Sequence, residues 1–445
     1  MVRNVSFNEE ELRKAQEDFK QAAATAADKA DDKLQNAAAK AVDEAKAKRD
    51  GEKKKKFQEL WKVPPRYEVK HPLGKGAYGC VCLARDNKEE RKVAIKNCKH
   101  LLEDLIDSKR VLREISILSM LDHPHVVKLY DVVVPSDLTG FNEIYFVLEL
   151  SDSDMKKLLH CDVLLDLVHV KSLFYNLLVG LNYIHSAGIW HRDLKPANCL
   201  INEDCSVKIC DFGLARAVGS SGAAYSTDMV ARDTKRHLTG HVVTRWYRAP
   251  ELILMQSDYT EAIDVWSAGC IYAELLMMVA TSKYSERAPL FPGQTCFPLS
   301  PHEGFQSNPR YHTNSKFDQM SKICDIVGTP TEDEIKRLDA EDARDYMRCF
   351  KKREGTGLRA RYEKLDKVGV DLMEKMLVFD PRKRVSVKQA LNHALFAEIR
   401  QCKIETTAKE PIRLDFEQAE EIDAKAMRKL FLREVRRFHP GLPEI

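Results

Sequence analysis

Two short stretches carry the side chains best suited to chemistry. Residues 191–198 read HRDLKPAN, and Asp211 begins a DFG triplet thirteen residues after Asn198. Asn198 and Asp211 offer hard oxygen atoms, the ligands that Mg²⁺ prefers. Asp193 supplies a carboxylate that can orient a hydroxyl group and accept its proton, and Lys195 supplies a nearby cation. Together these residue types suit the transfer of a phosphoryl group to a hydroxyl group.

A glycine-rich stretch lies upstream. Residues 74–79 read GKGAYG between two runs of β-type residues, and residues 93–96 read VAIK. Glycines let backbone amides approach phosphate groups closely. The same spacing occurs in dinucleotide-binding folds, but there it joins a strand to a helix. Its place between two strands favours a hairpin that covers phosphates.

With these motifs together, the sequence resembles the protein kinases. The resemblance implies ATP and Mg²⁺ as cofactors, with Asn198 and Asp211 as the metal ligands and Asp193 as the catalytic base. Lys195 would steady the moving phosphate. Lys96 would bind the α- and β-phosphates, held by an ion pair with Glu114 on a helix expected over residues 108–121.

By the same resemblance, the nucleotide lies between the glycine-rich hairpin and a hinge after the apolar run 144–150. Leu148 would be the gatekeeper, and the backbone groups that follow it would bind the adenine. The further residues implied to bind the nucleotide are Leu73, Gly74, Gly76, Gly79, Val81, Ala94, Glu149, Ser151, Asp154, Lys157 and Leu200.

Other motifs resemble the MAP kinase branch of the serine/threonine kinases. They are TRWYRAPE at 244–251, DVWSAG at 264–269, LFPG at 290–293 and DPRKR at 380–384. The resemblance implies protein substrates with Ser/Thr-Pro sites, an ion pair between Glu251 and Arg384, and a tail that wraps back across the small lobe. It covers about residues 67–440.

The activation segment departs from this branch. Where MAP kinases carry a threonine and a tyrosine one residue apart, this chain has Thr239, Gly240 and His241. The arrangement resembles the T-x-H class described in apicomplexan parasites. It predicts a single switch, in which an upstream kinase or autophosphorylation modifies Thr239. The resemblance maps arginines onto this switch: Arg113, Arg192 and Arg216 toward a phosphothreonine, and Arg245 and Arg248 toward His241.

A second departure lies in the tail. Residues 406–409 read TTAK where most MAP kinases carry an acidic docking patch. Binding of basic docking peptides is therefore in doubt. The acidic side chains further along could replace the patch or be plain surface: Asp415, Glu417, Glu420 and Glu421.

The elements that would hold these motifs are expected to form an α+β protein with the bilobal kinase fold. The expected parts are a helical extension (1–60), a β-rich small lobe (61–150), a mainly helical large lobe (151–400) and a returning tail (401–445). The large lobe would hold the activation segment, 211–251, and an insert, 291–319. The alanine-rich extension reads either as a solvated helix or as one that packs on the kinase body.

Composition limits the class of protein. The formal net charge of the 445-residue chain is only +3, so no bulk attraction to nucleic acid is expected. No apolar run of about 18 residues suggests a membrane span. Twelve cysteines without C-x-x-C pairs indicate reduced thiols in a cytoplasmic or nuclear protein. We expect a monomeric kinase; a pseudokinase scaffold, or a module organised around the N-terminal helix, is the alternative.

Overall fold

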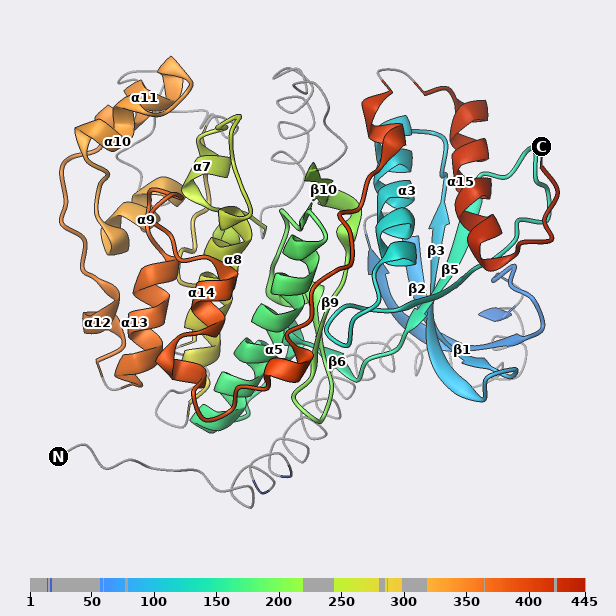
Figure 1. Ribbon diagram of the computed structural model, residues 1–445, viewed down its shortest axis with the longest axis horizontal. Coiled ribbons are helices and arrows are strands. Elements are labelled where there is room, and N and C mark those ends of the chain that lie inside the picture. Colours follow the sequence, from blue (N-terminus) through green and yellow to red (C-terminus); the bar gives the residue numbers. More distant parts are fainter. Residues whose placement is uncertain are drawn as a thin grey trace, which may run out of the picture.

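The computed structural model describes most of the chain beyond the N-terminal extension (Figure 1). The described residues are 57–58, 60–76, 79–218, 244–279, 287–297, 318–363, 365–419 and 422–444, with Lys14, Glu17 and Ser285. The predictions for the rest of the helical extension, for Thr239 and His241, for residues 298–317 of the insert, and for Glu420 and Glu421 of the tail therefore lie outside the described residues.

A five-stranded antiparallel sheet forms the small lobe, in the order β1-β2-β3-β5-β4. Its strands are β1 (Tyr67–Gly76), β2 (Gly79–Asp86), β3 (Arg91–Lys99), β4 (Leu129–Val132) and β5 (Glu143–Glu149). Apolar and β-branched residues dominate the buried positions of β3 and β5, as a sheet covered on both faces requires.

Two helices lie side by side next to this sheet (Figure 1). They are α3 (Leu105–Met120) and α15 (Ala424–Phe438), which is the last helix of the tail. Helix α3 begins three residues before the expected start because Asp104 caps it, accepting hydrogen bonds from the backbone of Ile106 and Asp107. The last helix of the tail therefore packs against α3 and β4 of the small lobe.

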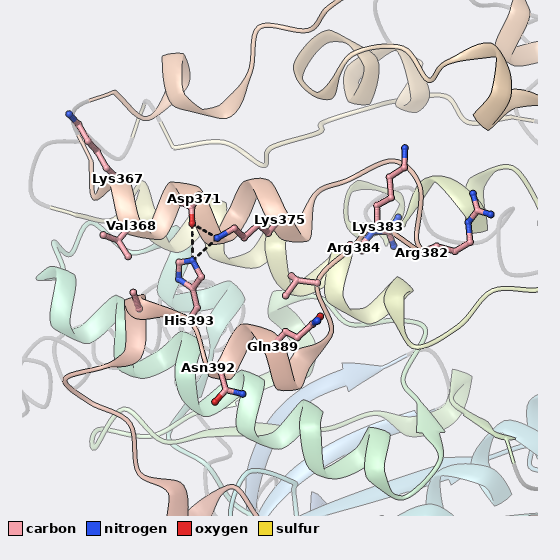
Figure 2. Close-up of a pocket in the computed structure, with 12 residues that line it drawn as sticks. Lys367, Val368, Asp371, Lys375, Arg382, Lys383, Arg384, Gln389, Asn392 and His393 are labelled. Atoms are coloured by element: carbon pink, nitrogen blue, oxygen red, sulfur yellow. Dashed lines mark hydrogen bonds and ion pairs between the residues drawn. The ribbon is translucent and has the colours of Figure 1, made fainter.

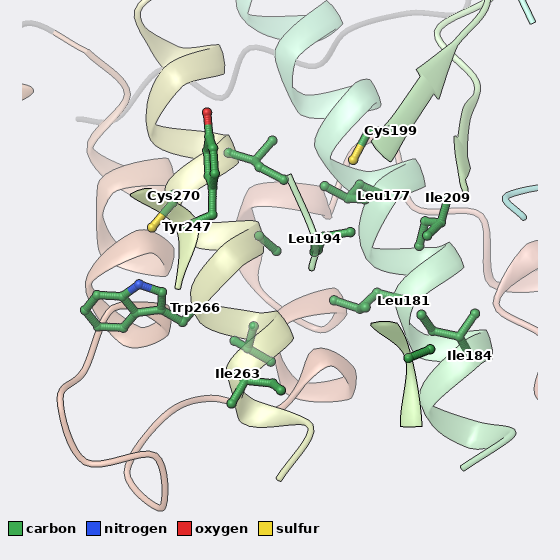
Figure 3. Close-up of a cluster of buried hydrophobic side chains, with 14 of the residues drawn as sticks. Leu177, Leu181, Ile184, Leu194, Cys199, Ile209, Tyr247, Ile263, Trp266 and Cys270 are labelled. Atoms are coloured by element: carbon green, nitrogen blue, oxygen red, sulfur yellow. The ribbon is translucent and has the colours of Figure 1, made fainter. Parts of the chain in front are cut away.

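The large lobe is built around two buried helices, α5 (Leu167–Ser186) and α8 (Ala262–Leu276). Figure 3 shows Leu177, Leu181 and Ile184 of α5 and Ile263 of α8 within one apolar cluster. The surrounding helices are α4 (Met155–His160), α7 (Pro250–Ile253), α9 (Gln319–Val327), α10 (Glu332–Lys336), α11 (Glu341–Arg348), α12 (Leu358–Arg361), α13 (Lys367–Met376) and α14 (Val387–Leu391).

Short strands next to α5 hold the loops that carry the chemistry. One small sheet has the order β6 (Ser153–Asp154), β8 (Cys199–Ile201), β9 (Val207–Ile209). A second pairs β7 (Ile189–Trp190) with β10 (Arg216–Ala217). Residues 191–198 therefore run between β7 and β8, and the DFG triplet lies between β9 and β10. The predicted α+β fold, with a small lobe rich in strands and a helical large lobe, is confirmed.

Among the described residues, none of the helices is both long and apolar enough to cross a membrane.

Candidate active site

The predicted ion pair between the small-lobe strand and helix forms. Lys96 Nζ on β3 lies 2.8 and 2.7 Å from the two carboxylate oxygens of Glu114 on α3. Burial alone would lower the pKa of the Lys96 ammonium, but the charges of Glu114 and Asp211 outweigh burial and raise it. Lys96 is therefore a fixed cation next to the DFG triplet.

Asp193 is held by the residues predicted to act with it. Lys195 Nζ lies 2.5 Å from Asp193 Oδ2, and Asn198 Nδ2 donates to the Asp193 backbone oxygen over 2.9 Å. The other carboxylate oxygen, Asp193 Oδ1, is buried and has no hydrogen-bond partner among the described residues. One oxygen is thus oriented by a cation while the second can accept a hydrogen bond from a hydroxyl group.

The two stretches that carry the predicted metal ligands are joined by backbone contacts. The amide of Cys210 donates to the backbone oxygen of Asn198 over 3.0 Å, which places Asp211 beside Asn198. Burial would raise the pKa of Asp211, yet Lys96 and Lys195 outweigh burial and hold that pKa below its ordinary value. An ionised carboxylate and an amide oxygen side by side fit a hard cation such as Mg²⁺.

Two residues of the site have left-handed backbones, at Arg192 and Asp211, both with φ of +67°. Such backbones are strained for residues other than glycine and need support from their surroundings. Asp264 at the start of α8 supplies it for the first: its oxygens accept from the amides of His191 and Arg192 over 2.7 and 2.9 Å. Asp264 belongs to the DVWSAG motif, but its contact with residues 191–192 was not predicted.

The glycine-rich stretch joins the paired strands β1 and β2, while its role in covering phosphates stays a prediction. Gly76 pairs with Gly79 at the turn, and Gly74 has open space where a side chain would be. A Cβ at Gly79 would overlap the backbone oxygen of Asn97 on β3, so only glycine fits there. Leu73, next to Gly74, is 37% exposed. In the same sheet, Val81 lies opposite Lys96.

The predicted adenine and ribose residues lie on β3 and β5 of the small lobe and at β6 and β8 of the large lobe. Ala94 pairs with Leu148 in the sheet, and Asp154 pairs with Leu200 between β6 and β8. Asp154 also caps α4, since it accepts from the amide of Lys157 over 2.9 Å. At the hinge, the side chain of Glu149 pairs with Lys208 over 3.0 Å, and Ser151 Oγ is buried without a partner among the described residues.

The three arginines mapped onto Thr239 all lie around the residues that follow Asp211. Arg113 donates to the backbone oxygen of Gly213 over 2.5 Å, and Arg192 donates to that of Leu214 over 3.4 Å. Arg192 and Arg216 both lie over the ring of Tyr259, at 5.4 and 5.8 Å. Whether a phosphate on Thr239 reaches them stays a prediction, because Thr239 lies outside the described residues.

Arg113 has a second partner that was not predicted. Its Nε lies 2.6 Å from Glu417 of the tail, and the side chains of both residues are nearly buried. Glu417 is therefore engaged with α3 and does not serve as an exposed docking acid, as one interpretation of the tail supposed. Arg113 and Glu417 are 304 positions apart, so no local sequence pattern predicts their contact.

The TRWYRAPE motif is held by a buried ion pair. Glu251 and Arg384 lie 2.6 Å apart, as expected. Close by, Arg245 is buried, and its NH1 has no partner among the described residues. Arg248 is partly buried, and burial lowers the pKa of its guanidinium. Their predicted contact with His241 lies outside the described residues.

A groove of about 910 Å³ lies elsewhere, between α13 and α14 (Figure 2). Asp371 holds Lys375 and His393 there, at 2.6 and 2.8 Å, while Lys383 pairs with Glu334 over 2.7 Å. None of the residues predicted for catalysis or nucleotide binding lines this groove. It is separate from the site described above.

Comparison with known proteins identifies the family. A model of the protein kinase domain matches residues 67–396. Mitogen-activated protein kinase 6 of Arabidopsis thaliana is 37% identical over 385 residues, which is 86% of both chains. Mitogen-activated protein kinase 5 of Oryza sativa subsp. japonica is 38% identical over 387 residues, covering 87% of this chain and 93% of the relative. The chain therefore belongs to the protein kinase family and is a serine/threonine protein kinase of the MAP kinase type.

Proposed function

We propose that this chain transfers the γ-phosphate of Mg-ATP to serine or threonine hydroxyls that precede proline in protein substrates. The observation that carries the proposal is the state of Asp193, with one oxygen held by Lys195 and the other buried and unpartnered among the described residues. That oxygen can orient the substrate hydroxyl and take its proton as the new P–O bond forms.

The other residues of the site have distinct roles in this proposal. Lys96, fixed by Glu114, orients the α- and β-phosphates, and Lys195 stabilises the charge on the moving phosphoryl group. Mg²⁺ bound by Asn198 and Asp211 would neutralise the negative charge of the triphosphate. The preference for proline rests on Arg248 and its surrounding TRWYRAPE loop, together with the similarity to mitogen-activated protein kinases.

We also propose that phosphorylation of Thr239 alone switches the enzyme, as in the T-x-H class. A phosphothreonine carries about −1.5 to −2 charge and needs several guanidinium groups around it. Arg113, Arg192 and Arg216 surround the residues after Asp211, so one phosphate among them would connect α3, the catalytic loop and the activation segment. A tyrosine would carry a second phosphate as an ester of its hydroxyl group, and His241 has no hydroxyl group.

The transfer reaction is tested by incubating the full chain with labelled ATP, with or without Mg²⁺, and two peptides that differ only in Ser-Pro against Ser-Ala. We expect Mg²⁺-dependent transfer that favours the Ser-Pro peptide. If neither peptide is labelled, while ATP still binds, the pseudokinase alternative replaces the proposal.

The switch is tested separately with Thr239→Ala and His241→Ala. We expect Thr239→Ala to lower activity strongly and His241→Ala to lower it less, measured after stoichiometric phosphorylation of the wild type. Equal activity of the phosphorylated wild type and Thr239→Ala would refute the single-site switch, whatever the outcome of the peptide test.

A further inference from the structure

The outer face of α15 carries a regular row of cations. Lys425, Lys429, Arg433 and Arg437 are all exposed and follow one another at intervals of four residues. Residues four apart lie on the same face of a helix, about 6 Å from one to the next along the axis. We name these four residues the basic stripe.

Acidic side chains do not balance this row. Helix α15 contains six lysine and arginine side chains and a single glutamate, a net charge of +5, whereas the whole chain has only +3. The glutamate, Glu434, pairs with Arg437 over 2.8 Å. Within the described part of the chain, Lys425, Lys429 and Arg433 have no acidic partner. Like charges four residues apart destabilise a helix, so the stripe lowers the stability of α15.

The needs of the fold do not explain the stripe. Met427, Phe431 and Val435 form the buried face of α15, which packs on α3, and the stripe faces away from them. Cations in the last turn favourably oppose the helix dipole, which accounts for Arg437. Lys425 lies in the first turn, where a cation is unfavourable. A feature that lowers stability without a local gain points to a function.

We propose that the basic stripe is a docking surface for an acidic protein segment. In an extended chain, every second side chain points the same way, about 6.6 Å apart, so alternating carboxylates match the steps of the stripe. The exposed positions of α15 carry no aromatic or large apolar side chain to stack on bases or enter a bilayer. Charge complementarity with a protein segment is the interaction that remains.

The stripe is tested on the full chain without nucleotide, so that the result is independent of catalysis. A fluorescent peptide of alternating glutamate and serine is titrated with the wild type and with a double variant, Lys429→Glu with Arg433→Glu. The matched control is Lys351→Glu with Lys352→Glu, because these lysines are also exposed and the change in net charge is the same.

We expect the stripe variant to weaken peptide binding by about tenfold or more and the control by about twofold or less, with both effects shrinking at high salt. The melting temperature of the stripe variant should not fall, because the double change turns repulsion into attraction in two of the three neighbouring pairs, those with Lys425 and with Arg437, and leaves one like-charge pair. This measurement excludes unfolding as the cause of lost binding.

Two results would overturn the proposal. In one, the control weakens binding as much as the stripe variant does, so that only bulk charge matters. In the other, the wild type binds phosphatidylserine vesicles through the stripe but does not bind the peptide, which would make the partner a membrane surface.

Discussion

One oxygen of the Asp193 carboxylate is held by Lys195, and the other has no partner among the described residues. Asp193→Asn tests whether this carboxylate acts as the base. The amide cannot accept a proton, but it leaves Asn198 and Asp211 in place. We expect kcat to fall by at least about a hundredfold, the lower range for a general base, while ATP affinity stays within about twofold. Single-turnover transfer and equilibrium binding measure the two quantities.

The matched control is Asp162→Asn, because Asp162 is exposed and makes no described contact with the site. It should keep the activity of the wild type. Near-normal single-turnover transfer by Asp193→Asn would remove Asp193 from the role of base.

Glu274 gives a prediction for the dependence of stability on pH. It is buried on α8, and burial raises its pKa from 4.5 to about 7, although a hydrogen bond from Tyr247 opposes the shift. Its Oε1 has no partner among the described residues. A raised pKa in the folded state contributes stability that is fully present below about pH 4.5 and is lost as the pH rises through about 7.

Glu274→Gln should remove this loss, since the amide stays neutral and can still accept from Tyr247. We expect its free energy of unfolding to match the wild type near pH 4.5 and to exceed it by on the order of 3 kcal/mol above about pH 8. Urea unfolding at several pH values measures the difference. Parallel pH curves for the two proteins would contradict the assignment.

The sequence predicted those residues of the site that a single motif places close together. Asp193, Lys195 and Asn198 lie within six residues, and their mutual contacts follow from that spacing. Asp264 supports the same loop from 72 residues away. Only the packing of α8 against the loop brings it there, so its role needed the structure.

Residues at the junction of the N-terminal extension and the small lobe pack on the small-lobe sheet. The ring of Trp61 packs 6.0 Å from that of Tyr145 on β5, and Gln58 donates to the backbone of Val69 on β1 over 2.9 Å. Trp61 is only 8% exposed. These contacts belong to a cluster on the sheet that includes Tyr67 and Val147.

We therefore expect Trp61→Ala to lower the free energy of unfolding by about 3–5 kcal/mol. Leu60→Ala is the control, since Leu60 is 60% exposed and should change stability by less than about 0.5 kcal/mol. Deleting residues 1–56 keeps the contacts of Trp61 and should leave the melting temperature and ATP affinity unchanged. A lower melting temperature after that deletion would place further residues of the extension in the fold.

The helix expected over 108–121 was predicted more closely than its start. Most of its residues are buried in α3, but α3 starts three residues earlier than predicted. Asp104 is the N-cap residue, and polar residues at caps lie outside an apolar pattern.

At the scale of the whole molecule, the tail connects the lobes. Ile412 donates to the backbone of Ala187 in the large lobe over 2.8 Å, and Glu417 then pairs with Arg113 on α3. The family resemblance implied a tail that returns to the small lobe. It did not predict the pairing of Glu417 with an arginine of the proposed switch, because that contact depends on the side chains of this particular chain.

We expect catalysis to depend on the packing of α15 against α3. Phe431 is fully buried between α15 and the rest of the core, and α15 packs on α3, the helix that carries Glu114. Phe431→Ala should leave a cavity and lower the free energy of unfolding by about 3–5 kcal/mol. It should also lower kcat/KM for ATP at temperatures where the chain stays folded, because a loosened α3 no longer fixes the ion pair between Glu114 and Lys96. Leu164→Ala, at a leucine that is 54% exposed in the large lobe, should change neither quantity. If Phe431→Ala lost stability but kept the kcat/KM of the wild type, α15 would support the fold without positioning Glu114.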